Sequence, residues 1–131
     1  MRFTPDTNVL VRVIVRDDPR QAQEAERILR EASRIAVTLP CICEVVWVLR
    51  TGYRLTREEV GGAIRTLLDA SNVEVNRLDA EAGLAILDAG GDFADGVIAH
   101  EGRWLGGEEF VSFDRRAVTQ LRAGGVQARL L

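Results

Sequence analysis

The chain has 131 residues, of which 47% are hydrophobic and 28% are charged, and its formal net charge is −3 at pH 7. This balance is typical of a soluble globular protein and predicts one domain that covers residues 1–131. The negative net charge argues against a protein that coats nucleic acid by bulk attraction, but it allows a local basic surface.

The cysteines and the apolar segments indicate neither a membrane protein nor a secreted one. No apolar run approaches the roughly 18 residues of a membrane span, and we see no secretory signal at the N-terminus. Cys41 and Cys43 give no disulfide framework, and with His100 as the only histidine they match no common zinc pattern. We therefore expect a protein of the reducing cytoplasm.

Short β-prone segments alternate with helical patterns along the first 75 residues. Asp18 followed by Pro19 is a typical start of a helix, and Thr56 with Glu59 forms a capping-box pattern. The predicted strands cover residues 2–5, 35–38 and 73–75, and the predicted helices cover 8–15, 19–32, 40–52 and 57–70.

The same alternation continues to the end of the chain. We expect Asp79 to cap a helix that ends at Gly90 and Gly91, and Asp92 to cap the next helix. The remaining predicted helices cover residues 93–105 and 114–123, and the remaining predicted strands cover 109–113 and 126–130.

Alternating short strands and longer helices predict an α/β protein, in the form of a three-layer α/β/α sandwich around a short, mainly parallel central sheet. Ligand sites in such folds lie beyond the carboxyl ends of the strands. Asp6 follows the first predicted strand, and Asp114 follows the strand at 109–113. We therefore expect both carboxylates at one edge of the sheet.

Two further acids stand out on predicted helices. Glu44 lies opposite the apolar stripe of its helix, on a second face that is also apolar, so we expect a deeply buried helix in which Glu44 is either functional or paired with an arginine such as Arg50. Asp95 lies one turn after Asp92, near the small residue Ala99 that leaves room for a ligand. The position of Asp92 is explained by capping, whereas Asp95 has no such role. His100 is expected to be a structural histidine rather than a ligand.

Asp6 stands at the head of an apolar run, where a buried carboxylate would need a positive partner. If Asp6, Glu44, Asp95 and Asp114 converge within about 5 Å, each pair repels by roughly 3 kcal/mol at an effective dielectric constant of about 20. A cation would offset this repulsion. Ligands that are all oxygen atoms favour a hard ion, Mg²⁺ or Mn²⁺, which usually acts on phosphate esters.

Four segments of the sequence, DTNVLVR, CEVVWVLR, DFADGVIA and SFDRRAV, resemble those of the PIN-domain ribonucleases. The resemblance covers essentially the whole chain and is greatest to the VapC-like toxins of toxin–antitoxin modules. It implies that Asp6 and Asp95 are the main metal ligands, that Glu44 completes the ligand set, and that Asp114 is the fourth acid. Asp92 is either a cap or an auxiliary ligand. Ser112 stands where the family usually has threonine, which retains the hydroxyl group.

The resemblance also implies the reaction and the partners. A water activated by Mg²⁺ or Mn²⁺ would cleave RNA internally and leave a 5′-phosphate and a 3′-hydroxyl. A homodimer and a cognate antitoxin that blocks the acidic site are expected as well. The arginines expected to bind the RNA backbone are Arg12, Arg50, Arg115 and Arg116.

Two other classes of function are compatible with parts of the pattern. An aspartyl-phosphate-type phosphatase or a receiver domain could use Asp6 as the phosphate acceptor, but such proteins need a lysine, and all 17 basic residues of this chain are arginine. The phosphatase also needs a second Asp where this chain has Asn8. A non-catalytic α/β module that binds protein or RNA is the other alternative, although it would not need four mutually repelling acids.

Overall fold

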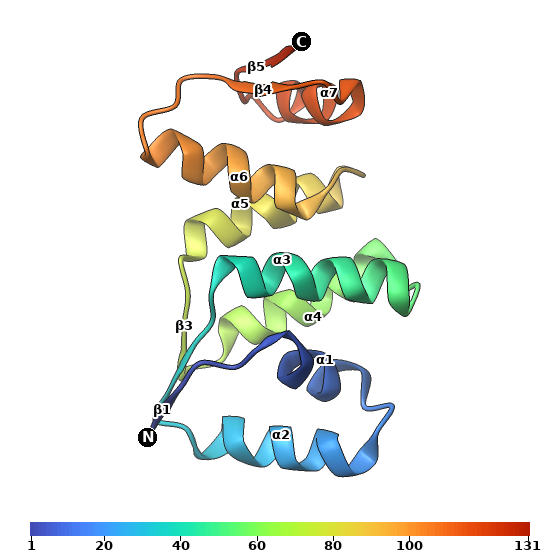
Figure 1. Cartoon of the computed structure of the whole chain (residues 1–131), viewed down its shortest axis with the longest axis vertical. Coiled ribbons are helices and arrows are strands. Elements are labelled where there is room, and N and C mark those ends of the chain that lie inside the picture. The colour runs from blue at the N-terminus through green and yellow to red at the C-terminus, as the bar shows by residue number, and fades with distance from the viewer. The chain divides into compact units, whose positions relative to one another are not determined.

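The computed structural model describes all residues from 1 to 131, which divide into two compact units, residues 1–76 and 77–131. The predicted α/β class is confirmed, because seven α-helices accompany two sheets in which every strand pairing is parallel (Figure 1). No helix combines the length and the apolar character that are needed to cross a bilayer.

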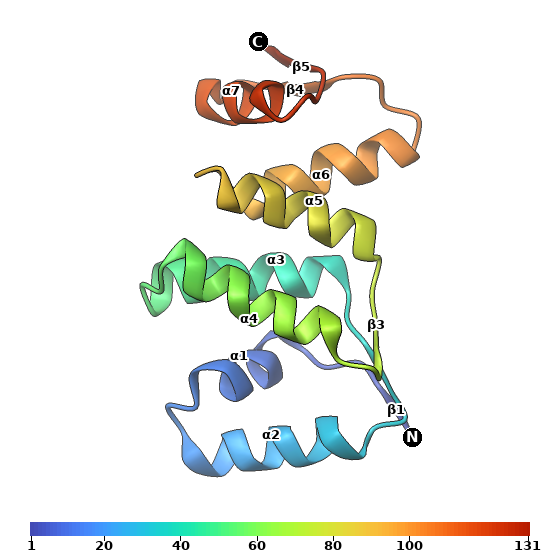
Figure 2. The same cartoon turned by 180° about the vertical axis from the view of Figure 1, so that it is seen from behind.

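The first unit carries a three-stranded sheet in the order β1-β2-β3, with Phe3 beside Ile35 and Ile35 beside Val73. Helices α1 and α2 of this unit lie side by side in both views (Figures 1 and 2). The elements of the unit are β1 (Arg2–Phe3), α1 (Thr7–Val15), α2 (Pro19–Glu31), β2 (Arg34–Ala36), α3 (Leu39–Trp47), the π-helical turn η1 (Val48–Gly52), α4 (Arg57–Asp69) and β3 (Val73–Glu74).

Side-chain caps set where these helices begin. The predicted capping box is confirmed: the Glu59 backbone N–H donates to Thr56 Oγ1 at 3.1 Å, and the Thr56 N–H donates to Glu59 Oε1 at 3.0 Å. Asp18 caps α2 as expected, with its Oδ1 accepting from the Gln21 N–H at 3.1 Å. Such caps satisfy backbone donors that have no partner within the helix.

Helix α3 is buried on one face and only partly buried on the other. Ile42, Val45 and Leu49 are fully buried, which confirms the predicted core stripe. The expected deep burial of the second face holds for Cys41, which is 8% exposed, but is wrong for Trp47, which is 66% exposed, and for Glu44, which is also exposed. The prediction relied on the apolar composition of that face, but the sequence does not show whether a tryptophan is exposed or buried.

The second unit carries the parallel pair β4-β5, with Phe110 beside Ala128 and Ser112 beside Leu130. Val118 and Leu121 pack with Ile86 in a small apolar core below this pair. The elements of the unit are α5 (Arg77–Asp88), α6 (Phe93–Trp104), β4 (Phe110–Ser112), α7 (Arg115–Ala123) and β5 (Ala128–Leu130).

Helices α5 and α6 pack closely through two glycines. A Cβ atom on Gly96 would lie 2.5 Å from the carbonyl oxygen of Ala82, and one on Gly83 would lie 2.8 Å from side-chain atoms of Phe93 and Val97. Both distances are shorter than van der Waals contact allows. The crossing therefore depends on the absence of side chains at both positions.

Asp79 does not cap α5, so this prediction is wrong. The helix already begins at Arg77, and Asp79 lies in its first turn, 8% exposed, with Oδ1 2.5 Å from His100 Nδ1 on α6. A buried carboxylate needs such a partner. The contact also agrees with the expectation that His100 is a structural histidine.

Candidate functional site

Asp6 follows β1 and Pro5 and caps helix α1. Its Oδ1 accepts a hydrogen bond from the Val9 backbone N–H at 3.1 Å. The side chain is exposed, so the expected burial of Asp6 is wrong and no desolvation cost calls for a cation there. Instead, the cap holds one carboxylate oxygen against the helix, and Oδ2 lies outside this bond.

Cys41 connects Asp6 with Glu44. The thiol lies one helical turn before Glu44, and its Sγ is 3.8 Å from the Pro5 carbonyl oxygen. Burial raises the pKa of the Cys41 thiol, a hydrogen bond with Thr7 lowers it, and the negative charges of Asp6 and Glu44 raise it further. The charges of both Asp6 and Glu44 therefore act on the same thiol within the first unit.

Asp114 caps helix α7 at the carboxyl end of β4. Its Oδ1 accepts from the backbone N–H groups of Arg116 at 2.9 Å and of Ala117 at 3.2 Å. The Asp114 N–H in turn donates to Ser112 Oγ at 2.9 Å. The hydroxyl of Ser112 thus fixes the backbone that carries the acid, and serine performs this role without the methyl group of threonine.

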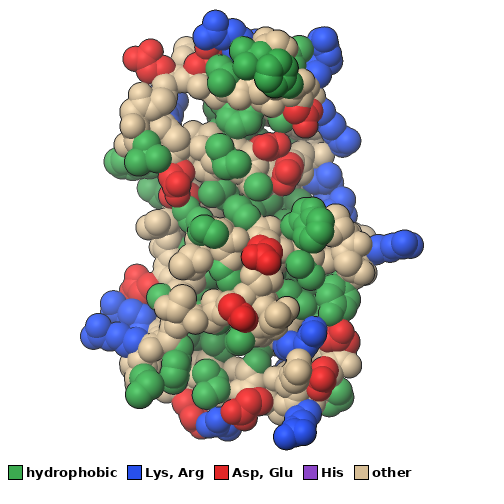
Figure 3. Space-filling view, in the orientation of Figure 1, with side chains coloured by type: hydrophobic (Ala, Val, Ile, Leu, Met, Phe, Trp, Pro, Cys, Tyr) green, Lys and Arg blue, Asp and Glu red, His purple; other side chains and the backbone are tan.

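The surroundings of Asp95 in the second unit disfavour its charged form. Asp92 caps α6 as predicted, with Oδ1 accepting from the Ala94 N–H at 3.0 Å. Partial burial raises the pKa of Asp95, and the negative charges of Asp92 and Asp114 raise it further. Asp92 and Asp114 of the second unit are therefore near enough to Asp95 for their charges to affect it. Acidic side chains lie at the surface of both units (Figure 3).

The raised pKa gives a testable stability effect. In metal-free protein at pH 7, Asp95→Asn is expected to raise the melting temperature by about 1–4 °C, because the variant removes a charge that the fold disfavours. An acid whose pKa is higher in the folded state destabilises the fold above that pKa and has no effect below its unfolded pKa of about 4. The gain should therefore shrink as the pH falls through the raised pKa and vanish near pH 4. Melting curves of the wild type and of Asp95→Asn across this pH range measure the gain. A large loss of stability in Asp95→Asn at pH 7 would show that Asp95 is structural.

Arg12 is held within the first unit. Its Nη1 donates to the Tyr53 hydroxyl at 3.1 Å and its Nε donates to Gln21 Oε1 at 2.8 Å, while Tyr53 donates to Asp17 Oδ2 at 2.8 Å. This network joins α1, α2 and the residue that follows η1. These bonds give Arg12 a structural role, and the guanidinium would have to break some of them to contact RNA.

The other three predicted RNA-binding arginines differ in the hydrogen bonds that they make within the chain. Arg50 Nη1 donates to the Leu55 carbonyl oxygen at 2.9 Å, and Arg116 Nη2 donates to the Gly90 carbonyl oxygen at 3.2 Å. Arg115 is exposed at the first position of α7, directly after Asp114. Of the four, Arg115 is therefore the best placed to contact a phosphate near an acid.

The donor chemistry fits a divalent cation. Asp6, Glu44, Asp95 and Asp114 offer only oxygen atoms, which are the ligands that Mg²⁺ and Mn²⁺ prefer. The raised pKa of Asp95 shows negative charge that a cation would stabilise. Within either unit, no three acidic, cysteine or histidine side chains lie close enough to hold an ion by themselves.

The sequence did not predict two features of the acidic residues, namely the capping role of two site acids and the partner of Asp79. Asp6 and Asp114 were expected from their places after strands, but their capping role was not, although both precede helical patterns and Asp is a preferred N-cap residue. The Asp79–His100 pair had no signal in the sequence, because its two residues are 21 positions apart on different helices.

Comparison with known proteins identifies the family. A model of the PIN domain family matches residues 4–122, which include all four predicted site acids and most of each unit. No curated protein matches the sequence. The match confirms the PIN-domain part of the resemblance. The chain therefore belongs to the PIN domain family, whose members are typically metal-dependent nucleases.

Proposed function

We propose that this chain is an endoribonuclease that uses Mg²⁺ or Mn²⁺ to hydrolyse RNA phosphodiester bonds, and that it is the toxin of a toxin–antitoxin module. Membership of the PIN family supports the nuclease chemistry. The observation that carries the proposal is that the family match over residues 4–122 includes Asp6, Glu44, Asp95 and Asp114. Burial and the charges of Asp92 and Asp114 raise the pKa of Asp95, which agrees with a site for a cation.

In this proposal, Asp6, Glu44, Asp95 and Asp114 hold the ion. When bound, a divalent ion polarises a phosphoryl oxygen and lowers the pKa of a water molecule, which makes that water a nucleophile. Asp6 and Asp114 each use Oδ1 as a helix cap, so Oδ2 is the oxygen that we assign to the ion. The caps fix both carboxylates before the ion binds, which lowers the cost of ordering them.

Incubation of the purified chain with total RNA tests the reaction. We expect internal cuts in the presence of Mn²⁺ or Mg²⁺ that leave 5′-phosphate and 3′-hydroxyl ends, and no cuts in EDTA. Ends with 2′,3′-cyclic phosphates, or cleavage that persists in EDTA, would contradict metal-dependent hydrolysis. A phosphorylated Asp6 after incubation with a phosphate donor would instead support the aspartyl-phosphate alternative.

The toxin role gives a prediction for Glu44. Because the side chain is exposed, Glu44→Gln should fold normally, yet expression of the variant should no longer arrest bacterial growth. Glu58→Gln is the matched control, since Glu58 is an exposed glutamate in the first turn of α4 and should leave growth arrest intact. Growth arrest that survives Glu44→Gln would remove the assigned role of Glu44.

The proposed partners are an antitoxin and a second copy of the chain. A small open reading frame beside the gene, whose product relieves growth arrest when the two are expressed together, would support the antitoxin. Sedimentation of the purified chain at twice its monomer mass of 14.5 kDa would support the homodimer.

A further inference from the structure

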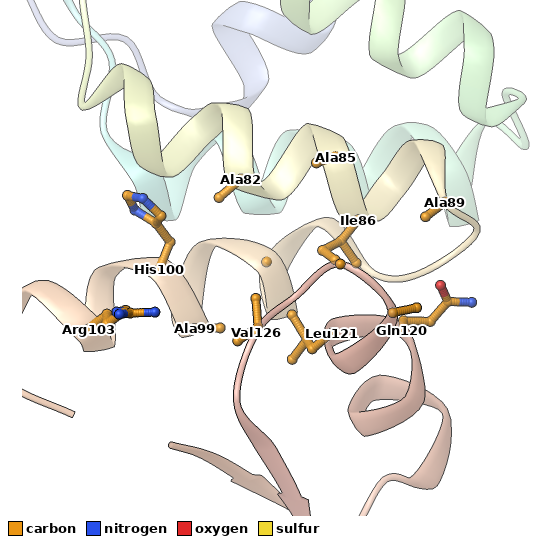
Figure 4. A pocket seen from close by; sticks show the side chains of 13 residues that line it. Ala82, Ala85, Ile86, Ala89, Ala99, His100, Arg103, Gln120, Leu121 and Val126 are labelled. Atoms are coloured by element: carbon orange, nitrogen blue, oxygen red, sulfur yellow. The ribbon is translucent and has the colours of Figure 1, made fainter. Parts of the chain in front are cut away.

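The second unit contains a cavity of about 310 Å³ that the proposed chemistry does not use. It lies among α5, α6, α7 and the segment between α7 and β5 (Figure 4). Its volume is at the lower end of the range for small-molecule sites. Gly96 of α6, which directly follows Asp95 in the chain, is one of the lining residues.

The walls of the cavity are apolar. Ile86, Leu121 and Val126 form its middle part, and Ala85 and Ala99 line it from α5 and α6. Small and aliphatic side chains such as these leave a space that an apolar or flat aromatic group can fill. The walls alone do not distinguish between such groups.

Three polar side chains lie at the ends of the cavity. Arg103 and His100 are at one end, and Gln120 is at the other (Figure 4). Asp79 holds His100 through Nδ1, which leaves Nε2 as the ring nitrogen for a ligand. The site thus offers a permanent cation, an oriented imidazole and an amide that both donates and accepts hydrogen bonds.

The charges of the lining distinguish this cavity from its neighbour. No acidic residue lines the 310 Å³ cavity. A second cavity of about 250 Å³ shares Arg103 with it but is also lined by Glu108 and Glu109, which would repel a phosphate. An anionic ligand is therefore favoured in the first cavity and disfavoured in the second.

We propose that the first cavity binds one nucleotide of the RNA substrate. The base lies between the aliphatic walls, the Gln120 amide hydrogen-bonds with its edge, and the Arg103 guanidinium binds the phosphate. A nucleotide matches all three features, because its base can contact the apolar walls and the amide while its phosphate binds the cation. This inference rests on the proposed function, and it makes the cavity a determinant of where the RNA is cut, because Gly96, the residue that follows Asp95, lines the cavity.

Metal-free binding tests the pocket apart from catalysis. The chain in EDTA is titrated with AMP, GMP, CMP and UMP, and with ribose 5-phosphate, while binding is followed by NMR. We expect saturable binding of at least one nucleotide and at least tenfold weaker binding of ribose 5-phosphate. No binding of any nucleotide, or equal binding of ribose 5-phosphate, would overturn the proposal.

Two variants and a control locate the binding. Arg103→Gln should weaken nucleotide binding about tenfold, since a charge-assisted hydrogen bond is lost. Ala85→Phe should abolish it by filling the cavity from an exposed position that the fold tolerates. Arg20→Gln, which removes an exposed arginine on α2 in the first unit, should leave the affinity unchanged. Equal affinities in all three variants would place the binding elsewhere.

Mapped cleavage ends complete the test. Gln120→Leu should change the base preference next to the cut at least fivefold in RNA treated with Mn²⁺, because the leucine cannot hydrogen-bond with a base edge. Nucleotide binding without any RNA cleavage would mean that the pocket exists and the proposed nuclease function fails. RNA cleavage with an unchanged pattern in Gln120→Leu would mean that the nuclease function holds and that the proposed role of the pocket fails.

Discussion

The Asp6→Asn variant is expected to lose RNA cleavage by at least about 100-fold while its melting temperature stays within about 2 °C of the wild type. Asparagine caps a helix as well as aspartate does, so the bond from the Val9 N–H is retained. The negative charge is lost, however, and with it the attraction for a divalent ion. Single-turnover cleavage with Mn²⁺, Mn²⁺ binding by calorimetry and thermal unfolding measure the three quantities.

Two further variants separate capping from catalysis. Asp18 caps α2 with the same geometry, through a 3.1 Å bond from the Gln21 N–H, and Asp18→Asn should leave both cleavage and stability unchanged. Asp6→Ala removes the cap as well as the charge and should cost about 1 kcal/mol of unfolding free energy in addition to activity. Normal cleavage by Asp6→Asn would leave capping as the sole role of Asp6 and end the metal-site proposal.

The second large effect is expected at the crossing of α5 and α6. Gly96→Ala should reduce the free energy of unfolding by about 3 kcal/mol, because the new Cβ would lie 2.5 Å from the Ala82 carbonyl oxygen. Backbone atoms form this contact, so the two helices would have to move apart. Urea unfolding measures the loss.

Gly102→Ala is the matched control on the same helix. No atom lies within 4 Å of a Cβ placed on Gly102, so alanine should stabilise α6 by up to about 1 kcal/mol through its higher helix propensity. Equal stabilities of Gly96→Ala and Gly102→Ala would show that the close crossing does not form in solution.

Local sequence signals predicted most of the secondary structure. The capping box at Thr56 and Glu59, and the caps at Asp18 and Asp92, were read correctly because each depends on residues within one turn. Burial was harder to predict. Trp47 is exposed although its helix is apolar nearly all round, because exposure depends on what packs against a face and not on the composition of that face.

The four acids of the candidate site stay a prediction, and the physical reason expected for one of them was wrong. The order of the acids along the chain was enough to suggest the family, which the match over residues 4–122 confirms. The expected reason for Asp6, a buried charge in need of a cation, was wrong, since Asp6 is exposed and serves as a cap. Asp79 was assigned a cap and instead bonds with His100, a long-range contact that no local pattern encodes.

Asp6 and Asp114 each combine a helix cap with a proposed metal ligand in one carboxylate, which has a consequence for how such a chain can change over generations. Selection for a folded chain would accept asparagine or serine at either position, since both residues start helices well. If these acids hold the ion as proposed, an inactive but intact copy is only one substitution away, and drift would reach it readily if nothing but stability were under selection.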